Sequence, residues 1–482
     1  MKKIIFIEPK APNLHIFSMF ALPRLGTFIL ATMMKNRGWD ASVIFEETGE
    51  IDFNIIKKAD LVGISTITST ATRAYAIADK IREMGVTVIM GGPHVTFLAE
   101  EALQHSDFVL RGEGEIPLMK FIDQWEGSRD FTKVPGLSFL QNGSIAETDS
   151  VPYIKNMDLI PYPDPALLKK HLAKLGGRYT IPVQTSRGCP FNCSFCSVTG
   201  MFGKKYRFRS TENIIEELRN YNHNKNVIFF YDDNFTANRE RAKELCKAMI
   251  KENFKFKWST QVRVDIAKDE ELVRLMKKSG CHTLYIGFES VNPESLKEMQ
   301  KSQSVEDIKS AIKILKKYKI HIHGMFVYGF DTDTEGSIRE TLKFAKSSGI
   351  SSAQFLILTP LPGSATYNAL KNQGRIKFKE WSLYDAHHVV FEPVNLTMAQ
   401  LQHAQIESHQ KFYSFTQIVK HILAFRWLDL GIAYYARSLN RVWKKRNRIF
   451  LKIVDLLTPK KGIQISIDYR TDVSLEPQKR VA

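Results

Sequence analysis

The sequence predicts an α/β protein in three parts: an N-terminal Rossmann-like, doubly wound parallel sheet, a central partial (β/α)6 TIM barrel and a C-terminal, mainly helical domain. Two successive series of short apolar, β-rich runs alternate with helical patterns of about a dozen residues, which is the pattern of parallel sheets covered by helices. After these series the chain becomes helical and rich in aromatic residues. The 482 residues are enough for about three domains.

The first series of strands and helices occupies residues 1–150. Its opening run follows two lysines and could be mistaken for a signal peptide, but only residues 4–7 are apolar before Glu8 and Pro9, which is too short for one. The run is therefore predicted to be a buried first strand. We expect strands at 3–9, 40–46, 59–66, 86–92 and 107–115, and helices at 26–37 and 71–84.

Small, hydroxylated and polar residues follow these strands at their carboxyl ends. Doubly wound sheets bind ligands at that edge, where small residues let a ligand approach the backbone and hydroxyl groups form hydrogen bonds with it. The segments do not match the G-x-G-x-x-G dinucleotide fingerprint. The candidate binding residues are Ser65, Thr66, Thr68, Gly91, Gly92, His94, Gly112, Glu113, Gly114 and Glu115.

A proline-rich linker with a short helix, at 151–179, precedes the second series, which occupies 180–362. Six strand-like segments separated by helical patterns predict a partial barrel, whose catalytic groups belong at the carboxyl ends of its strands. Ser210 or Thr211 is expected to cap a helix over 212–218. The expected strands are 180–188, 226–236, 256–265, 281–290, 321–330 and 352–363.

Three cysteines, Cys189, Cys193 and Cys196, form a Cys-x3-Cys-x2-Cys array after the first barrel strand. Thiolates gathered in one loop suit an iron–sulfur cluster, zinc or copper. A structural zinc site and an electron-transfer cubane each take four protein ligands, and no fourth cysteine or well-placed histidine lies nearby in the sequence. A cubane held by three thiolates would leave one iron open to bind another molecule. A zinc site and a chance group of buried cysteines are the alternatives.

This loop, with Phe195 directly before its last cysteine, resembles the signature of the radical S-adenosylmethionine (SAM) superfamily. The resemblance implies that the three cysteines hold a catalytic [4Fe–4S] cluster, whose open iron chelates the amino and carboxyl groups of SAM. It also implies that Phe195 belongs to the cofactor-binding loop. Reduction of the cluster would then cleave SAM to methionine and a 5′-deoxyadenosyl radical.

The same resemblance assigns residues at later strand ends to SAM. The triplet Asp-Asp-Asn stands where the family usually has Gly-Gly-Glu, whose backbone contacts the SAM amino group, and the end of the fourth strand would hold the ribose and methionine parts. Helix capping or a strand-end salt bridge is the alternative for Asp233 and Glu289. Arg207 and Arg209, beside the loop, are either functional or simply pairing charges. The implied cofactor-binding residues are Asp232, Asp233, Asn234, Arg263, Glu289 and Ser290.

The N-terminal segments that contain Ser/Thr, Gly-Gly-Pro-His and Arg-Gly-Glu-Gly-Glu resemble the B12-binding domain that precedes the barrel in one subgroup of this superfamily. The resemblance implies cobalamin as a third cofactor, with methylcobalamin as the methyl donor. The Asp-x-His-x-x-Gly motif that supplies a cobalt ligand elsewhere is absent, so no protein histidine is expected on the cobalt. A domain that has kept the shape but binds no cobalamin is the alternative.

The C-terminal part, 363–482, is expected to be mostly helical and basic, with a disordered end past 459. It resembles the extra domain of the hopanoid-methylating branch. Basic residues far outnumber acidic ones at 420–461, and the whole chain has a net charge of +17, which favours an acidic partner. Interleaved aromatic and basic residues suit a helix at a membrane interface. A helical cap with a solvated basic face is the alternative, and no nucleic acid is expected because no RNA-binding module is recognisable.

These features together predict a cobalamin-dependent radical SAM enzyme that methylates an unactivated carbon of a lipid-like or other hydrophobic small molecule. A radical SAM cyclase or rearrangement enzyme acting on a tetrapyrrole or natural product is the enzymatic alternative, and a non-catalytic corrinoid or iron–sulfur carrier is the other. The electron donor is expected to be a flavodoxin or ferredoxin. Five cysteines without a disulfide pattern, and no run of about 18 uncharged apolar residues, predict a cytoplasmic protein that could contact the inner face of the membrane peripherally.

Overall fold

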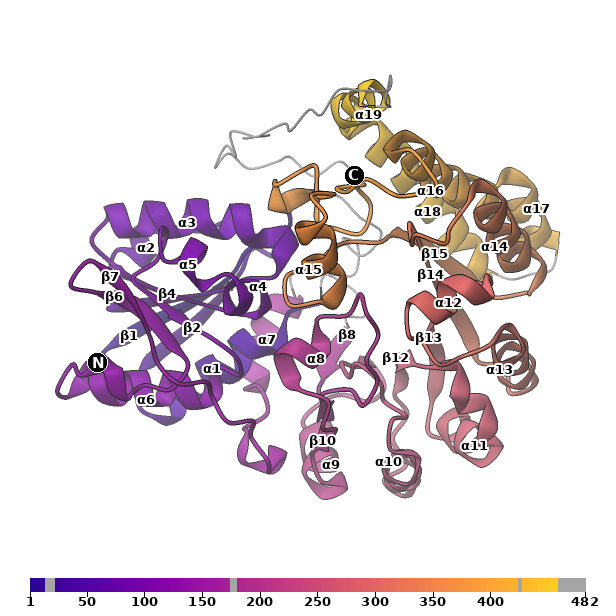
Figure 1. The fold of residues 1–482 in the computed structure, drawn as a ribbon. Coiled ribbons are helices and arrows are strands. Elements are labelled where there is room, and N and C mark those ends of the chain that lie inside the picture. Colours follow the sequence, from indigo (N-terminus) through magenta and orange to yellow (C-terminus); the bar gives the residue numbers. More distant parts are fainter. Residues whose placement is uncertain (14–21, 174–179, 424–426, 458–482) are drawn as a thin grey trace.

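The computed structural model describes residues 1–13, 22–173, 180–423 and 427–457. Along the chain, a first sheet with its helices is followed by a second sheet with its helices and then by a group of helices, which confirms the predicted fold class (Figure 1). The predicted disordered end past 459 and the last residues of the predicted linker, 174–179, lie outside the described residues.

Seven strands form the first sheet, in the order β2-β1-β3-β4-β5-β6-β7, and β1 to β5 are parallel. Its side chains alternate between two buried cores: Ile4 and Phe6 of β1 belong to one, and Ile5 and Ile7 to the other. Helices α1 and α6 cover one face and α3 covers the other (Figure 1). The strands are β1 (Lys3–Glu8), β2 (Asp40–Phe45), β3 (Leu61–Ser65), β4 (Thr87–Gly91), β5 (Phe108–Leu110), β6 (Leu137–Gln141) and β7 (Ser144–Glu147). The helices are α1 (Leu25–Asn36), α2 (Phe53–Ile56), α3 (Ala71–Glu83), α4 (Pro93–Phe97), α5 (Ala99–Ala102), α6 (Glu115–Glu126) and α7 (Pro165–Leu172).

The antiparallel hairpin of β6 and β7 at the edge of this sheet was not predicted. Asn142 and Gly143 join the two strands, and both have positive φ angles, 53° and 80°. Asn-Gly is the typical pair for a two-residue hairpin turn because that turn requires positive φ at both positions. The signal was therefore present in the sequence.

Six parallel strands form the second sheet, in the order β15-β14-β13-β12-β11-β8, so that each strand pairs with the next one of the series. This confirms the six predicted strands of a partial barrel. The strands are β8 (Thr180–Val183), β11 (Val227–Phe230), β12 (Lys257–Val262), β13 (Cys281–Glu289), β14 (His321–Tyr328) and β15 (Ser352–Ile357). The helices are α8 (Val198–Phe202), α9 (Thr211–Arg219), α10 (Arg239–Lys251), α11 (Glu270–Lys278), α12 (Pro293–Glu298), α13 (Val305–Lys317) and α14 (Glu335–Ser347).

The C-terminal part is helical, as predicted, throughout most of its described residues. Its helices are α15 (Ala365–Asn372), α16 (Met398–Phe412), α17 (Phe415–Leu423), α18 (Trp427–Arg446) and α19 (Arg448–Leu456). Among the described helices, none has both the length and the apolar character needed to cross a membrane.

Side chains from α16 and the residue that follows it cover the outer edge of the second sheet. Gln405 donates through Nε2 to the carbonyl of Phe355 (2.9 Å). The Tyr413 hydroxyl donates to the carbonyl of Ala353 (2.7 Å) and accepts from its N–H (2.9 Å). These bonds satisfy backbone groups that an edge strand otherwise leaves open. The C-terminal helices thus occupy the place where further strands would extend the barrel.

Candidate active site

The three cysteines of the array lie on one loop at the carboxyl end of β8. The chain leaves β8, forms the short strand β9 (Ser186–Arg187), passes through the cysteine loop into α8, and returns as β10 (Arg207–Phe208), which pairs antiparallel with β9. All three thiols are free and half-buried, whereas Cys246 and Cys281 are fully buried elsewhere in the barrel. The cysteine loop therefore presents its thiols at the strand end where barrel catalysis takes place.

The donor set of this loop suits an iron–sulfur cluster. Backbone N–H groups of Phe191 and Val198 donate to the sulfurs of Cys189 and Cys196, and burial raises the pKa of both thiols, to about 12 for Cys196. In the described ranges, no three His, Cys, Asp or Glu side chains converge on a point that could hold one metal ion. A zinc ion needs such convergence, but a cubane binds each thiolate to a different iron, so its ligands are spread more widely.

Arg263, at the end of β12, lies against the cysteine loop. Its Nη1 is 3.9 Å from Sγ of Cys193, and its guanidinium lies 3.7 Å from the centre of the Phe191 ring. Nη2 donates to the carbonyl of Lys301. The structure thus brings the predicted Arg263 to the thiols, where its positive charge favours the thiolate form of Cys189.

Glu289 ends β13 in the left-handed region (φ 59°), beside an irregularity in the strand pairing. Its carboxylate accepts from Nζ of Lys301 at 2.6 Å, and both side chains are 8% exposed. The next residue, Ser290, is buried and its hydroxyl accepts from the N–H of Asn292 (3.0 Å). The strand-end salt bridge, weighed as the alternative for Glu289, is therefore present, and its partner Lys301 was not predicted.

The three predicted residues beyond the end of β11, Asp232, Asp233 and Asn234, differ in their exposure. Asp232 is buried, and one of its oxygens accepts from the N–H groups of Thr185 and Ser186, each at 2.8 Å, so it fixes the chain between β8 and the cysteine loop. Asn234 is also buried and accepts from the Thr236 hydroxyl (3.3 Å). Asp233 alone projects outward. In this arrangement Asp232 positions the loop, whereas Asp233 is free to meet a ligand.

Asp233 and Tyr231 are both exposed at the carboxyl end of β11. Solvent reaches both side chains, yet the surrounding protein removes much of the water around them. Burial, assisted by the charge of Asp232, raises the pKa of Asp233 to about 7. Burial raises the pKa of Tyr231 to about 12, and the charges that modify it include Arg24 and Glu8 at the end of β1. Charged groups of the first sheet therefore lie near the end of β11.

Asp233→Asn is expected to make the cofactor-free protein more stable at pH 8 than the wild type, with a gain that disappears near pH 4. The folded protein keeps its proton on Asp233 up to pH about 7, whereas the ordinary value is 3.8, so the carboxyl lowers stability as pH rises through this window. Melting temperatures of both proteins at pH 5 and pH 8 measure the effect. An equal difference at the two pH values would contradict it.

Phe195, the aromatic residue before Cys196, packs its ring edge-on against Phe330 at 5.9 Å between centroids. It is only partly buried and contacts the main hydrophobic core. The ring therefore anchors the cysteine loop to the barrel, and any contact with a cofactor stays a prediction.

The first sheet has the strand order 2-1-3-4-5, in which ligands bind where the order reverses between β1 and β3. At this place Glu8 accepts from the backbone N–H of Arg24 (3.0 Å), and the Arg24 side chain donates to the carbonyl of Ser65 (3.4 Å). The hydroxyl of Thr66 is buried without a hydrogen-bond partner among the described residues. An unsatisfied buried hydroxyl at a ligand-binding edge fits a large polar ligand such as cobalamin.

Other predicted residues of this edge shape its loops. Gly91 accepts from the Thr66 N–H (2.9 Å). Gly92 has φ 101°, and a Cβ there would lie 2.6 Å from the Thr66 carbonyl oxygen, so no side chain fits. The Gly112 N–H donates to the Thr96 hydroxyl (3.0 Å), and Gly114 is the N-cap of α6. The glycines thus allow the close packing on which this edge depends.

His94 faces the C-terminal part of the chain. Its ring is buried, with Nδ1 3.3 Å from the Thr68 hydroxyl and Nε2 3.7 Å from the Glu101 carboxylate. Trp381 lies edge-on at 4.9 Å, and its own indole N–H donates to Glu101 (2.7 Å). His94 and Thr68 therefore join the first domain to a later segment, and a contact of His94 with a cofactor stays a prediction.

Glu113 and Glu115 do not point toward an open binding edge. They form buried ion pairs with Arg207 and Arg187, which flank the cysteine loop in the other domain. Burial by itself raises the pKa of Glu115, but Arg187 outweighs it and the pKa is lowered. Arg187 was not predicted, although it stands two residues before the first cysteine.

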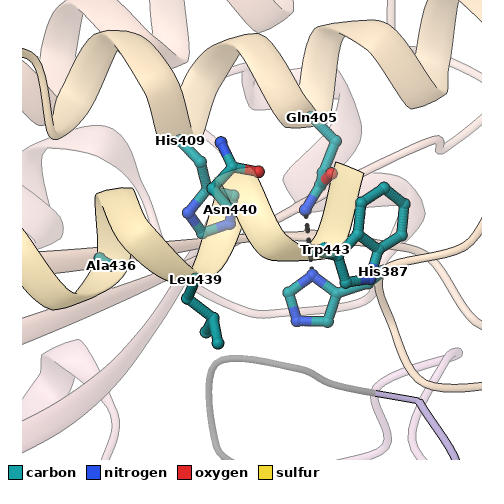
Figure 2. Close-up of a pocket in the computed structure, with 7 residues that line it drawn as sticks. All are labelled: His387, Gln405, His409, Ala436, Leu439, Asn440 and Trp443. Carbon is teal, nitrogen blue, oxygen red and sulfur yellow. Dashed lines mark hydrogen bonds between the residues drawn. The ribbon is translucent and has the colours of Figure 1, made fainter. Parts of the chain in front are cut away.

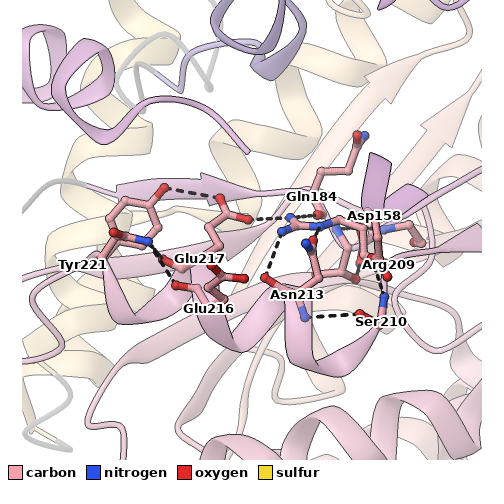
Figure 3. Close-up of polar contacts among 12 residues, drawn as sticks. Asp158, Gln184, Arg209, Ser210, Asn213, Glu216, Glu217 and Tyr221 are labelled. Atoms are coloured by element: carbon pink, nitrogen blue, oxygen red, sulfur yellow. Dashed lines mark hydrogen bonds and ion pairs between the residues drawn. The ribbon is translucent and has the colours of Figure 1, made fainter. Parts of the chain in front are cut away.

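A second network of polar contacts, formed mostly by barrel residues and joined by Asp158 of the preceding segment, holds the end of β8 (Figure 3). Arg209 donates to Glu217 of α9 (2.5 Å) and to the carbonyl of Gln184 (2.9 Å), and Tyr221 donates to Glu217 (3.3 Å). Ser210 caps α9 by accepting from the Asn213 N–H, as predicted. Arg209 is therefore a pairing charge, and so is Arg207.

A small pocket in the C-terminal part contains none of the predicted site residues (Figure 2). It lies between α16 and α18, where Gln405 contacts His387 (3.2 Å) and His409 contacts the carbonyl of Phe355 (3.0 Å). Burial lowers the pKa of His409 to about 4, so this ring is neutral near pH 7. These side chains attach the C-terminal helices to the barrel.

Comparison with known proteins agrees with this arrangement. Residues 183–345 match the radical SAM superfamily and residues 19–122 match the B12 binding domain. The chain is 35% identical to an uncharacterized methyltransferase of Pyrococcus horikoshii, over 86% of this chain and 92% of that protein. It is 29% identical to the bacteriochlorophyllide d C-12(1)-methyltransferase of Chlorobaculum tepidum, over 87% and 89% of the two chains.

Two further likenesses bear on fold and reaction. An anaerobic magnesium-protoporphyrin IX monomethyl ester cyclase of Cereibacter sphaeroides is 28% identical, over 76% of this chain and 61% of that protein. The solved structure of the cobalamin-dependent SAM radical enzyme OxsB, with aqua-cobalamin and SAM bound, has a TM-score of 0.70 at 16% identity and covers 93% of this chain and 75% of its own. The second likeness shows the fold alone.

Proposed function

The chain belongs to the cobalamin-dependent radical SAM enzymes, and from this premise we propose that it methylates an unactivated carbon of a hydrophobic small molecule. Its cofactors are a [4Fe–4S] cluster, SAM and cobalamin. When bound, they supply a radical able to abstract hydrogen from carbon and a methyl group for transfer. A flavodoxin or ferredoxin is the proposed source of the electron.

One observation supports this proposal: charged groups at the ligand-binding edge of the first sheet lie close enough to the carboxyl end of β11 to act on Tyr231. Tyr231 and Asp233 lie just after the carboxyl end of β11. Arg24 and Glu8 lie at the switch point of the first sheet, and their charges act on Tyr231. A substrate bound near Tyr231 and Asp233 would lie between the cysteine loop and the cobalamin-binding edge. Methyl transfer needs both cofactors to reach one carbon, and this placement meets that need.

The chain's own residues prepare the site in distinct ways. Cys189, Cys193 and Cys196 would hold the cluster, and Arg263 keeps positive charge beside them. Asp232 fixes the start of the loop through two backbone N–H groups, which limits its movement. The Thr66 hydroxyl would donate to cobalamin.

The proposal is tested by anaerobic reconstitution with iron, sulfide and hydroxocobalamin, followed by dithionite and SAM that carries a deuterated methyl group. We expect bound corrinoid, 5′-deoxyadenosine, and deuterated methyl groups in a hydrophobic extract offered as substrate. SAM cleavage without corrinoid would rule out methyl transfer. Cyclisation, which the cyclase relative favours as the second candidate, predicts 5′-deoxyadenosine and a tetrapyrrole product without deuterium.

The second part of the proposal is that the substrate is lipid-like and reaches the enzyme at an anionic membrane surface. Phe415 is 67% exposed, Trp427 64% and Tyr434 71%. On α18, Trp427, Tyr434, Arg441 and Lys445 recur at helical spacing on one exposed face. Aromatic and basic side chains on one helix face fit the apolar and anionic layers of a bilayer surface. Nearby exposed basic residues are Lys444, Arg446, Arg448 and Lys452.

Replacing Lys444, Lys445 and Arg446 together by glutamine is expected to weaken binding to phosphatidylserine liposomes by about two orders of magnitude. Each basic residue near an anionic surface contributes about 1 kcal/mol, and about 1.4 kcal/mol is a factor of ten. Flotation with liposomes of increasing phosphatidylserine content measures the binding.

A matched control replaces Lys309, Lys313 and Lys316, which are exposed on α13 of the barrel, by glutamine. This variant loses the same charge at another surface, so its liposome binding is expected to stay close to that of the wild type. Equal losses in the two variants would show a general charge effect. A wild type that does not float would overturn the membrane part and leave the reaction itself untouched.

A further inference from the structure

Four buried charges join the cobalamin-binding domain to the cysteine loop, and we call them the inter-domain clamp: Glu113, Glu115, Arg187 and Arg207. Arg207 donates two hydrogen bonds to Glu113, at 3.0 and 2.6 Å. Arg187 donates to Glu115 at 2.5 Å and lies 3.6 Å from Glu113. All four side chains are no more than 7% exposed.

The two arginines of the clamp flank the cysteine loop at its beginning and its end. Arg187 ends β9, two residues before Cys189. Arg207 lies in β10, and its guanidinium donates to the carbonyl of Phe202 (3.0 Å), the last residue of the helix that follows the loop. The clamp therefore fixes the two ends of the loop that carries the thiols.

The clamp also includes the segment that connects the two domains. Oε2 of Glu113 accepts from the N–H of Ile154 (3.1 Å), and Arg207 donates to the carbonyl of the same residue (2.9 Å). At the base of the loop, Gly188 has φ 85°, and a Cβ there would lie 2.6 Å from the Lys205 carbonyl oxygen. Three chain segments are thus held together at the clamp.

A buried charge network of this kind is weak evidence of added stability, because removing four charges from water is unfavourable. A two-bond contact between guanidinium and carboxylate fixes direction as well as distance. In a reaction that uses two cofactors on one substrate atom, a displacement of about 1 Å lowers the rate by about a hundredfold. A rigid connection between the two cofactor-binding parts would therefore keep both cofactors in place for the same substrate atom.

We infer that Glu113 and Glu115 are positioning residues that set the cobalamin-binding domain against the cysteine loop, and that they do not contact the corrin. This inference rests on the proposed function for its purpose but not for its geometry. It replaces the sequence-based prediction that both residues bind the cofactor. The clamp would keep the distance and orientation of the two metal centres constant.

Two measurements on Glu113→Gln test the clamp. Hydrogen exchange in the cofactor-free protein is expected to become at least about tenfold faster in the peptide covering 188–203, because the loop loses its anchor. In the reconstituted protein, corrinoid content is expected to stay within about twofold of the wild type. The magnetic interaction between the reduced cluster and cob(II)alamin, read by electron paramagnetic resonance, is expected to change because it depends on their separation.

Glu217→Gln is the matched control, since it breaks a buried Arg–Glu pair that lies beside the loop but within one domain. It is expected to speed exchange in α9 and to leave the magnetic interaction unchanged. Arg207→Lys keeps the charge and loses the two-bond contact. Its rate of loop exchange is therefore expected to lie between those of Glu113→Gln and the wild type. The double variant Glu113→Gln/Arg207→Gln leaves neither charge of this pair behind, which provides a folded protein if the single variant does not fold.

Faster loop exchange with retained corrinoid supports the clamp. Unchanged loop exchange overturns it, and so does loss of corrinoid alone, which would show a direct contact. If Glu113→Gln loses both the protection of the loop from exchange and the bound corrinoid, the double variant decides. Corrinoid retained by the double variant supports the clamp, and corrinoid lost from it overturns the clamp. Failure of the proposed function looks different, because the wild type would then transfer no deuterated methyl group while the exchange experiment could still give its result.

Discussion

Cys193→Ala is expected to give a folded protein that assembles no [4Fe–4S] cluster and cleaves no SAM. The loop supplies three thiols, and the described structure places no other thiol there that could replace a lost one, since Cys246 and Cys281 are fully buried in the barrel. The Cys193 side chain is only half-buried, so its loss is expected to change stability by about 0.5 kcal/mol. Iron content, 5′-deoxyadenosine formation and the melting temperature of the cofactor-free protein measure these effects.

Cys246→Ala is the matched control for this prediction. Cys246 is buried in α10, where burial raises its pKa to about 12, so it packs as a neutral thiol. Its removal is expected to lower stability and to leave the iron content per folded protein unchanged. A Cys193→Ala protein that retains full iron content and SAM cleavage would show that the three-cysteine assignment is wrong.

The fold could be predicted because buried segments have recognisable patterns of apolar residues in the sequence. Fully buried parallel strands are continuous apolar runs, and β1 and β4 begin and end within two residues of their predicted positions. The ribbon of β9 and β10 could not be predicted in this way, since two-residue strands carry no period. The hairpin of β6 and β7 could have been predicted from Asn142 and Gly143.

The candidate site was predictable where its residues are neighbours in sequence and not where they are distant. The cysteine array can be recognised from its spacing. Arg207 and Glu113, in contrast, are 94 residues apart, and no local pattern relates them. An acidic residue at a strand end is therefore easily assigned to a ligand. The structure shows that Asp232, Glu113, Glu115 and Glu289 contact protein groups, while Asp233 is exposed at the end of β11.

Lys301→Met is expected to destabilise the protein by about 3–5 kcal/mol, because it leaves the buried Glu289 carboxylate without its counter-charge. The two side chains are 12 residues apart and their charged atoms are 2.6 Å apart. The Glu289 carboxylate has little space to move away from this site, since a Cβ at Gly287 would lie 2.3 Å from it. Urea unfolding of the cofactor-free variant and wild type measures the change.

The double variant Glu289→Gln/Lys301→Met separates the ion pair from a role in SAM binding. If the pair is mainly structural, removal of both charges is expected to restore most of the lost stability, because no charge remains buried and uncompensated. A double variant as unstable as the single one would show that the two residues are not coupled. SAM affinity, measured on the reconstituted double variant, then decides the sequence-based prediction for Glu289: retained affinity excludes a SAM contact through its charge, and lost affinity with recovered stability establishes one.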